Sequence, residues 1–137
     1  MTLSLTTPTL RGAVAALLLC AGPAALALQS ETLGGQDDEA AAALVGELMF
    51  SADLLTSLDA MCPRGRPAPD WHAALPALPP KATTPDLLDL SRRLAADAGQ
   101  RLVQENGGCA SRSFNKAYDE SRESFGELIA RWKQLEP

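Results

Sequence analysis

The chain of 137 residues contains one histidine, His72, which follows Asp70 by two positions in the sequence Asp-Trp-His. A histidine that acts as a general base must reach its substrate, and an orienting carboxylate usually lies behind its ring. Asp70 could provide that carboxylate, but an aspartate here is also a good cap for a short turn over residues 71–75. The sequence has no nucleophile elbow, phosphate-binding glycine loop or HExxH motif. We therefore expect a protein that is not an enzyme.

Carboxylates also cluster near the C-terminus, where they could suggest a cation site. They are Asp119, Glu120, Glu123 and Glu127, and basic residues are interspersed among them. Calcium loops alternate oxygen ligands around a glycine turn, and this segment has no such turn. We interpret the cluster as the solvated face of a helix, and we predict neither a metal site nor a cofactor.

The segment 1–27 has the order of a secretory signal peptide. A polar stretch with Arg11 precedes an apolar run, and the sequence Ala-Leu-Ala at 25–27 fits a small-x-small cleavage site. The alternative is an uncleaved membrane anchor, but Gly22 and Pro23 interrupt the apolar run, and a membrane span needs about 20 residues. We predict cleavage near position 27, export to the periplasm or out of the cell, and no membrane association afterwards.

Cysteines indicate a disulfide in the exported chain. Cys20 belongs to the removed segment, and its lipidation is disfavoured because Leu19, rather than a small residue, precedes it. The remaining pair, Cys62 and Cys109, is typical of one disulfide in an oxidising compartment. The bond closes a loop of about 48 residues, which the chain-entropy model equates with about 4 kcal/mol. A metal or redox pair is the alternative, but the sequence has no CxxC motif.

The charge balance excludes two classes of partner. Acidic residues outnumber basic ones by 17 to 12, for a net charge of −5, and removal of the signal peptide would take away Arg11 but no acid. Nucleic acids and anionic membranes both select Lys/Arg patches, so neither is an expected partner.

Apolar residues recur at spacings of three and four in three stretches, which predicts helices over about 38–61, 85–106 and 112–135. We expect a flexible leader at 28–36 and then one domain over 37–137, an all-α, small three-helix bundle. The faces expected to be buried are, in chain order, Leu44, Leu48, Ala52, Leu55, Leu58 and Cys62; Leu87, Leu90, Leu94, Ala98 and Leu102; and Phe114, Tyr118, Ser121, Phe125, Leu128, Trp132 and Leu135. Each helix also has an interior glycine, which indicates either a close helix crossing or neutral drift: Gly46, Gly99 and Gly126.

A proline-rich connector over 63–84 joins the first two predicted helices and is expected to be extended. It carries three large apolar residues, Trp71, Leu75 and Leu78, which are candidates to bind a protein partner because Trp is favoured in interface hot spots. The alternative is that Trp71 lies over the bundle and closes its core. The regular apolar face of residues 114–135 could in addition serve a homodimer.

One disulfide between Cys62 and Cys109, with an aromatic-containing helix after it, resembles the acid-stress chaperones of the bacterial periplasm. That resemblance implies acidic residues that hold one shape at neutral pH and release it at low pH. The same scaffold is similar to periplasmic immunity proteins, which block a toxin. Neither resemblance includes a specific motif, so we assign no family. We predict a small exported protein that binds a protein partner as an inhibitor, immunity or adaptor protein; an acid-stress chaperone and a structural envelope protein are the alternatives.

Overall fold

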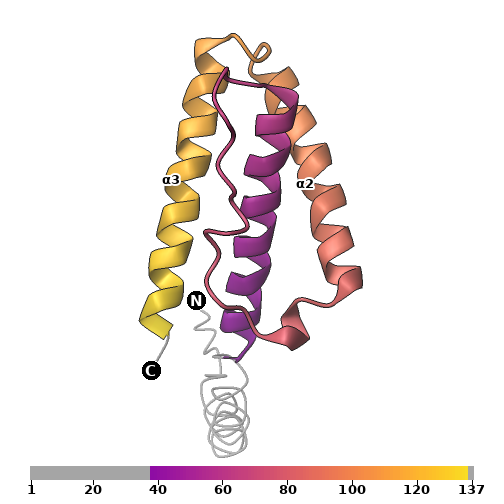
Figure 1. The fold of residues 1–137 in the computed structure, drawn as a ribbon, viewed down its shortest axis with the longest axis vertical. Helices are drawn as coiled ribbons and strands as arrows, with labels where there is room; N and C mark the ends of the chain where they lie inside the picture. Colours follow the sequence, from indigo (N-terminus) through magenta and orange to yellow (C-terminus); the bar gives the residue numbers. More distant parts are fainter. Residues whose placement is uncertain (1–37, 136–137) are drawn as a thin grey trace, which may run out of the picture. The chain divides into compact units, whose positions relative to one another are not determined.

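The computed structural model describes residues 38–135, and this part of the chain contains three α-helices, one short 3-10 helix and no strand (Figure 1). The N-terminal helix spans Asp38–Met61. After it come η1 at Pro80–Ala82, α2 at Pro85–Glu105 and α3 at Arg112–Leu135. The prediction of three helices with one disulfide is confirmed. The expected signal peptide at 1–27 and leader at 28–36 lie outside the described residues.

The N-terminal helix lies between α2 and α3, and the extended connector runs back along it (Figure 1). Because the connector returns to the end where the first helix began, α2 runs parallel to the N-terminal helix and α3 runs antiparallel to it. Thr84 is extended and Pro85 begins α2, where the missing proline N–H costs no helical hydrogen bond.

The hydrophobic core is formed mainly by the N-terminal helix and α3. All six residues predicted to be buried on the N-terminal helix are buried, and Val45 and Met49 join them. From α3 the core takes large side chains, namely Phe114, Tyr118, Phe125, Leu128 and Trp132. Leu135, expected in the same face, is 58 % exposed and is the last residue of α3.

By length and composition alone, the helix Asp38–Met61 is apolar enough to cross a membrane. Its apolar side chains, however, are those that pack against α3 and the connector. It also carries two carboxylates, Asp53 and Asp59, that form hydrogen bonds inside the fold. A central core helix has these properties, so the membrane-span composition reflects burial on several sides of one helix.

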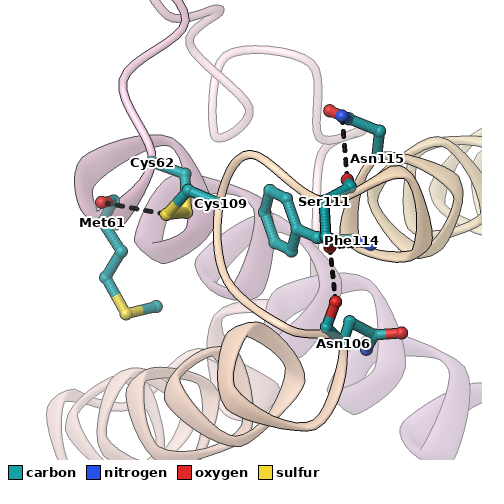
Figure 2. Close-up of a disulfide and its surroundings, with 7 residues drawn as sticks. All are labelled: Met61, Cys62, Asn106, Cys109, Ser111, Phe114 and Asn115. Carbon is teal, nitrogen blue, oxygen red and sulfur yellow. Dashed lines mark hydrogen bonds between the residues drawn. A yellow bond between two sulfur atoms is a disulfide. The ribbon is translucent and has the colours of Figure 1, made fainter.

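The disulfide joins the end of the N-terminal helix to the loop between α2 and α3, with the Cys62 and Cys109 Cα atoms 5.4 Å apart. Figure 2 shows the bond beside the ring of Phe114. Gly107 and Gly108 have φ values of 83° and 97°, the left-handed conformation that ends α2. The Ser111 hydroxyl accepts the Phe114 N–H at 3.0 Å and so caps the start of α3.

The predicted inward face of α2 is wrong for its first three leucines, whereas Ala98 and Leu102, also predicted to be buried, are half-buried. Leu87, Leu90 and Leu94 are 45 %, 45 % and 51 % exposed, whereas Ala95 and Gly99 are buried. The reason is a close approach of α2 to the N-terminal helix. A Cβ atom at Gly99 would lie 2.7 Å from Cε at the end of the Met61 side chain and 3.4 Å from Ser57 Oγ, so α2 lies close to the N-terminal helix at this point.

The glycines therefore differ, because a Cβ atom at Gly46 or Gly126 would have no neighbour within 4 Å. The close-crossing interpretation holds for Gly99 alone.

Candidate functional site: an anchored connector and an apolar groove

Two aspartates of the N-terminal helix bind the connector through consecutive residues. Asp53 is 8 % exposed and its Oδ1 atom lies 2.7 Å from His72 Nε2. Because an ionised carboxylate only accepts hydrogen bonds, the His72 Nε2 atom must carry the proton in this contact. The other carboxylate oxygen accepts the Ser91 hydroxyl of α2 at 2.6 Å. Asp53 therefore joins the N-terminal helix, the connector and α2.

Asp59 makes the corresponding link to α3. Its Oδ2 atom accepts the Trp71 indole N–H at 2.7 Å, and its Oδ1 atom accepts the Tyr118 hydroxyl at 2.6 Å. Burial of the phenol, and then the hydrogen bond to Asp59 and the charge of that carboxylate, raise the pKa of Tyr118 to about 12. The Trp71 ring also meets Phe125 edge to face, with centroids 5.9 Å apart.

The residues predicted to bind a partner are held against the core. Trp71, Leu75 and Leu78 are half-buried and pack on the buried cluster of the N-terminal helix and α3. This is the position expected if Trp71 covers the core. Partner binding by these three side chains stays a prediction, and it would have to use the halves of them that face solvent.

Asp70 and His72 do not act as a pair. Asp70 caps the short turn instead, since its Oδ1 atom accepts the Ala73 N–H at 3.1 Å. The acid that contacts His72 is Asp53, which lies between the imidazole and the Ser91 hydroxyl. In a Ser-His-Asp triad the imidazole stands between the other two groups and takes the serine proton. Here Ser91 donates its proton toward a carboxylate, so His72 has no access to it.

The search for metal ligands gives no candidate in the part of the chain that the structure describes. No three His, Cys, Asp or Glu side chains of residues 38–135 come close enough to hold an ion together. The C-terminal acids form ion pairs along α3 instead, such as Lys116 with Glu120 at 3.7 Å and Arg122 with Asp119 at 3.9 Å.

An apolar groove lies between the first half of α2 and the N-terminal helix. Figure 1 shows α2 leaning away from that helix toward its own first turns. The groove has a volume of about 500 Å³. Its walls include Ala42, Gly46 and Phe50 on the N-terminal helix and Leu87, Leu90 and Leu94 on α2. Sequence analysis missed this groove because it assigned the three leucines to the core.

Comparison with known proteins adds no relative. No family model, no curated protein and no solved structure matches the chain. A functional proposal for this protein must therefore come from its own residues.

Proposed function

We propose that the chain is exported, loses residues 1–27 and acts as a non-enzymatic protein that binds one protein partner, as an inhibitor, immunity or adaptor protein. The observation that supports this proposal is the exposed leucine row of α2, formed by Leu87, Leu90 and Leu94. A helix of a soluble protein normally turns its largest apolar side chains inward. Here the fully buried residues of α2 are the small ones, Ala95 and Gly99, and these three leucines line a groove instead.

The chemistry of the groove indicates the kind of partner surface that would fit it. The leucines follow one another at spacings of three and four, so they form one stripe along α2. An amphipathic helix binds in such a groove by inserting its own apolar stripe. Lys81 is the one charged residue among the groove's lining. We therefore expect the partner to present a helix with an acidic residue near the Lys81 end.

The hydrogen bonds by which Asp53 and Asp59 hold the connector, here called the anchors, would lower the entropic cost of binding. Asp53 binds Ser91 in the same part of α2 that lines the groove, and it simultaneously holds the connector. A groove whose walls are fixed before binding loses less conformational freedom when the partner arrives. The disulfide would contribute by fixing the other end of α2.

The experiment is an affinity capture from envelope extract of the source cell, using the mature, oxidised protein. We expect one partner in stoichiometric amount, and we expect the double variant Leu90→Gln/Leu94→Gln to lose it. Leu135→Gln is the control, because Leu135 is also an exposed leucine, at 58 %, but lies at the end of α3, outside the groove. Equal capture by wild type and double variant would contradict the groove as the binding surface.

An acid-stress chaperone is the second candidate, favoured by the carboxylate anchors of the connector. Protonation of Asp53 and Asp59 would remove the charges that the His72 and Trp71 rings bind. Release of the connector would uncover Phe125, which Trp71 contacts. At about pH 3, this function requires binding of an apolar dye and suppression of client aggregation. A protein that keeps its native near-UV spectrum at that pH would exclude this function.

A further inference from the structure

A second cavity lies at the disulfide end of the molecule, away from the leucine groove. It has a volume of about 630 Å³ and lies among the end of the N-terminal helix, the first residues of the connector and α3. Three arginines line it, Arg64 and Arg66 from the connector and Arg122 from α3. One acid, Asp59, also lines it, so the cavity is positively charged within a chain whose net charge is −5.

The connector arginines have no carboxylate to neutralise them. Among residues 38–135, neither Arg64 nor Arg66 forms a salt bridge. Arg122 approaches Asp119 only to 3.9 Å, and both side chains are exposed, so this pair is weak. The two oxygens of Asp59 already accept hydrogen bonds from Trp71 and Tyr118. Guanidinium donors are therefore available to a ligand.

Arg64 is held in position by an aromatic ring. Its guanidinium carbon lies over the Tyr118 ring, 3.6 Å from the ring centroid, which is a close cation–π contact. Stacking occupies the face of the guanidinium but leaves its in-plane N–H groups free to donate. The Asp59 hydrogen bond fixes Tyr118, and Tyr118 in turn fixes Arg64.

The connector backbone around the arginines is also restricted. Gly65, with φ of 68°, turns the chain between Arg64 and Arg66. Pro63, Pro67 and Pro69 line the same cavity, and each proline ring fixes its own φ angle. Arginines on a stiff backbone lose less freedom when they bind an anion.

We propose that this arginine cavity binds a small organic anion whose phosphate or carboxylate group is held by Arg64, Arg66 and Arg122. The planar, forked donors of arginine match both of these oxyanions. The proline, alanine and tyrosine walls accommodate an apolar body attached to the charged group. This site is independent of the protein-binding proposal, since the leucine groove shares none of its residues.

The test is isothermal titration of the oxidised protein at low salt with phenyl phosphate, benzoate and the uncharged benzyl alcohol. We expect phenyl phosphate or benzoate to bind with a stoichiometry of one anion per chain. The anion with the higher affinity identifies the preferred charged group. Arg64→Gln is expected to weaken binding about tenfold or more, because it removes charge-assisted hydrogen bonds. Arg66→Gln, which keeps the Tyr118 contact intact, is the second variant if Arg64→Gln fails to fold.

Arg93→Gln provides the matched control. It makes the same change in net charge on α2, where Arg93 pairs with Asp89 outside the cavity, and it should leave the affinity within about twofold. The proposal is overturned if neither anion binds, if benzyl alcohol binds as tightly as the anions, or if Arg93→Gln weakens binding as much as Arg64→Gln.

Discussion

The two helices that flank the N-terminal helix pack on it in opposite ways. α3 inserts its largest residues, including Phe114, Phe125 and Trp132, into the core. On α2 the fully buried residues are the small ones, Ala95 and Gly99, and Leu88 and Leu102 are only partly buried against the core. Leu87, Leu90 and Leu94 remain exposed. The two helices also have one feature in common. In each, one hydroxyl donates a hydrogen bond to an aspartate that holds the connector.

This difference predicts that stability and the proposed partner binding depend on different helices. Large buried side chains supply most of the hydrophobic free energy of folding, and here they come from the N-terminal helix and α3. α2 contributes less buried surface, through the partly buried Leu88, Leu102 and Val103, and it adds the Ser91 hydrogen bond to Asp53. Substitution of Leu87, Leu90 or Leu94 is therefore expected to have little effect on the fold.

The largest expected effect is on the free energy of unfolding, when one apolar side chain of α3 and one of α2 are each shortened to alanine. Phe125→Ala should lower the free energy of unfolding by about 3–5 kcal/mol, because it empties a buried site. Leu94→Ala should cost about 1 kcal/mol or less, since half of that side chain already faces solvent. Urea unfolding followed by far-UV circular dichroism measures both values, and similar losses would break the comparison.

The Tyr118 hydroxyl of α3 can be titrated by itself, because Tyr118 is the one tyrosine of the chain. Its pKa of about 12 exceeds the ordinary value of 10, so the folded protein keeps the phenol proton that the unfolded chain loses. Stability should therefore be intact below pH 10 and fall by about 2–3 kcal/mol as the pH rises to 12. Rapid pH-jump absorbance at 295 nm should place the phenolate midpoint near 12.

Two matched variants show whether Asp59 contributes to that shift. Asp59→Asn removes the negative charge beside the phenol and should move the midpoint toward 10. Asp53→Asn makes the same change at the α2 anchor and should leave the midpoint unchanged, because Asp53 does not contact Tyr118. A folded wild-type protein that titrates near 10 would refute the prediction.

The smallest expected effect concerns the glycines. Gly126→Ala on α3 should stabilise the protein by about 0.5–1 kcal/mol, because alanine favours the helix and the new methyl group enters open space. Gly99→Ala on α2 should gain less, because the end of Met61 must move to admit the methyl group. Thermal melting of the two variants measures the difference, and an equal gain would argue against the close crossing.

Much of the fold could be predicted because its determinants are local. Apolar spacing identified the inward faces of the N-terminal helix and α3, and Pro63, Pro85 and the glycine pair at 107–108 mark helix ends. The face of α2 could not be predicted in the same way. Leu87, Leu90 and Leu94 form as regular a stripe as a buried face does. Their exposure follows from contacts across the fold, at Gly99 and at Ser91.

The hydrogen bonds that hold the connector could not be predicted from local sequence either, because they join residues far apart in the chain. Asp53 is 19 residues from His72, and Asp59 is 12 residues from Trp71, so neither pair shows a sequence motif. One signal was present, since Asp53 follows Ala52 within an apolar stretch where a charged residue must find partners. Sequence proximity instead suggested Asp70 as the carboxylate that contacts His72.

The position of the disulfide has a consequence for proteolysis. Residues 63–108, which include the whole connector and α2, lie inside the covalent ring that Cys62 and Cys109 close. A protease that cuts the exposed connector once would open the ring without releasing a fragment. The N-terminal helix and α3, which form the core, would remain joined through sulfur. A single nick should therefore leave one molecule under oxidising conditions and two fragments after reduction.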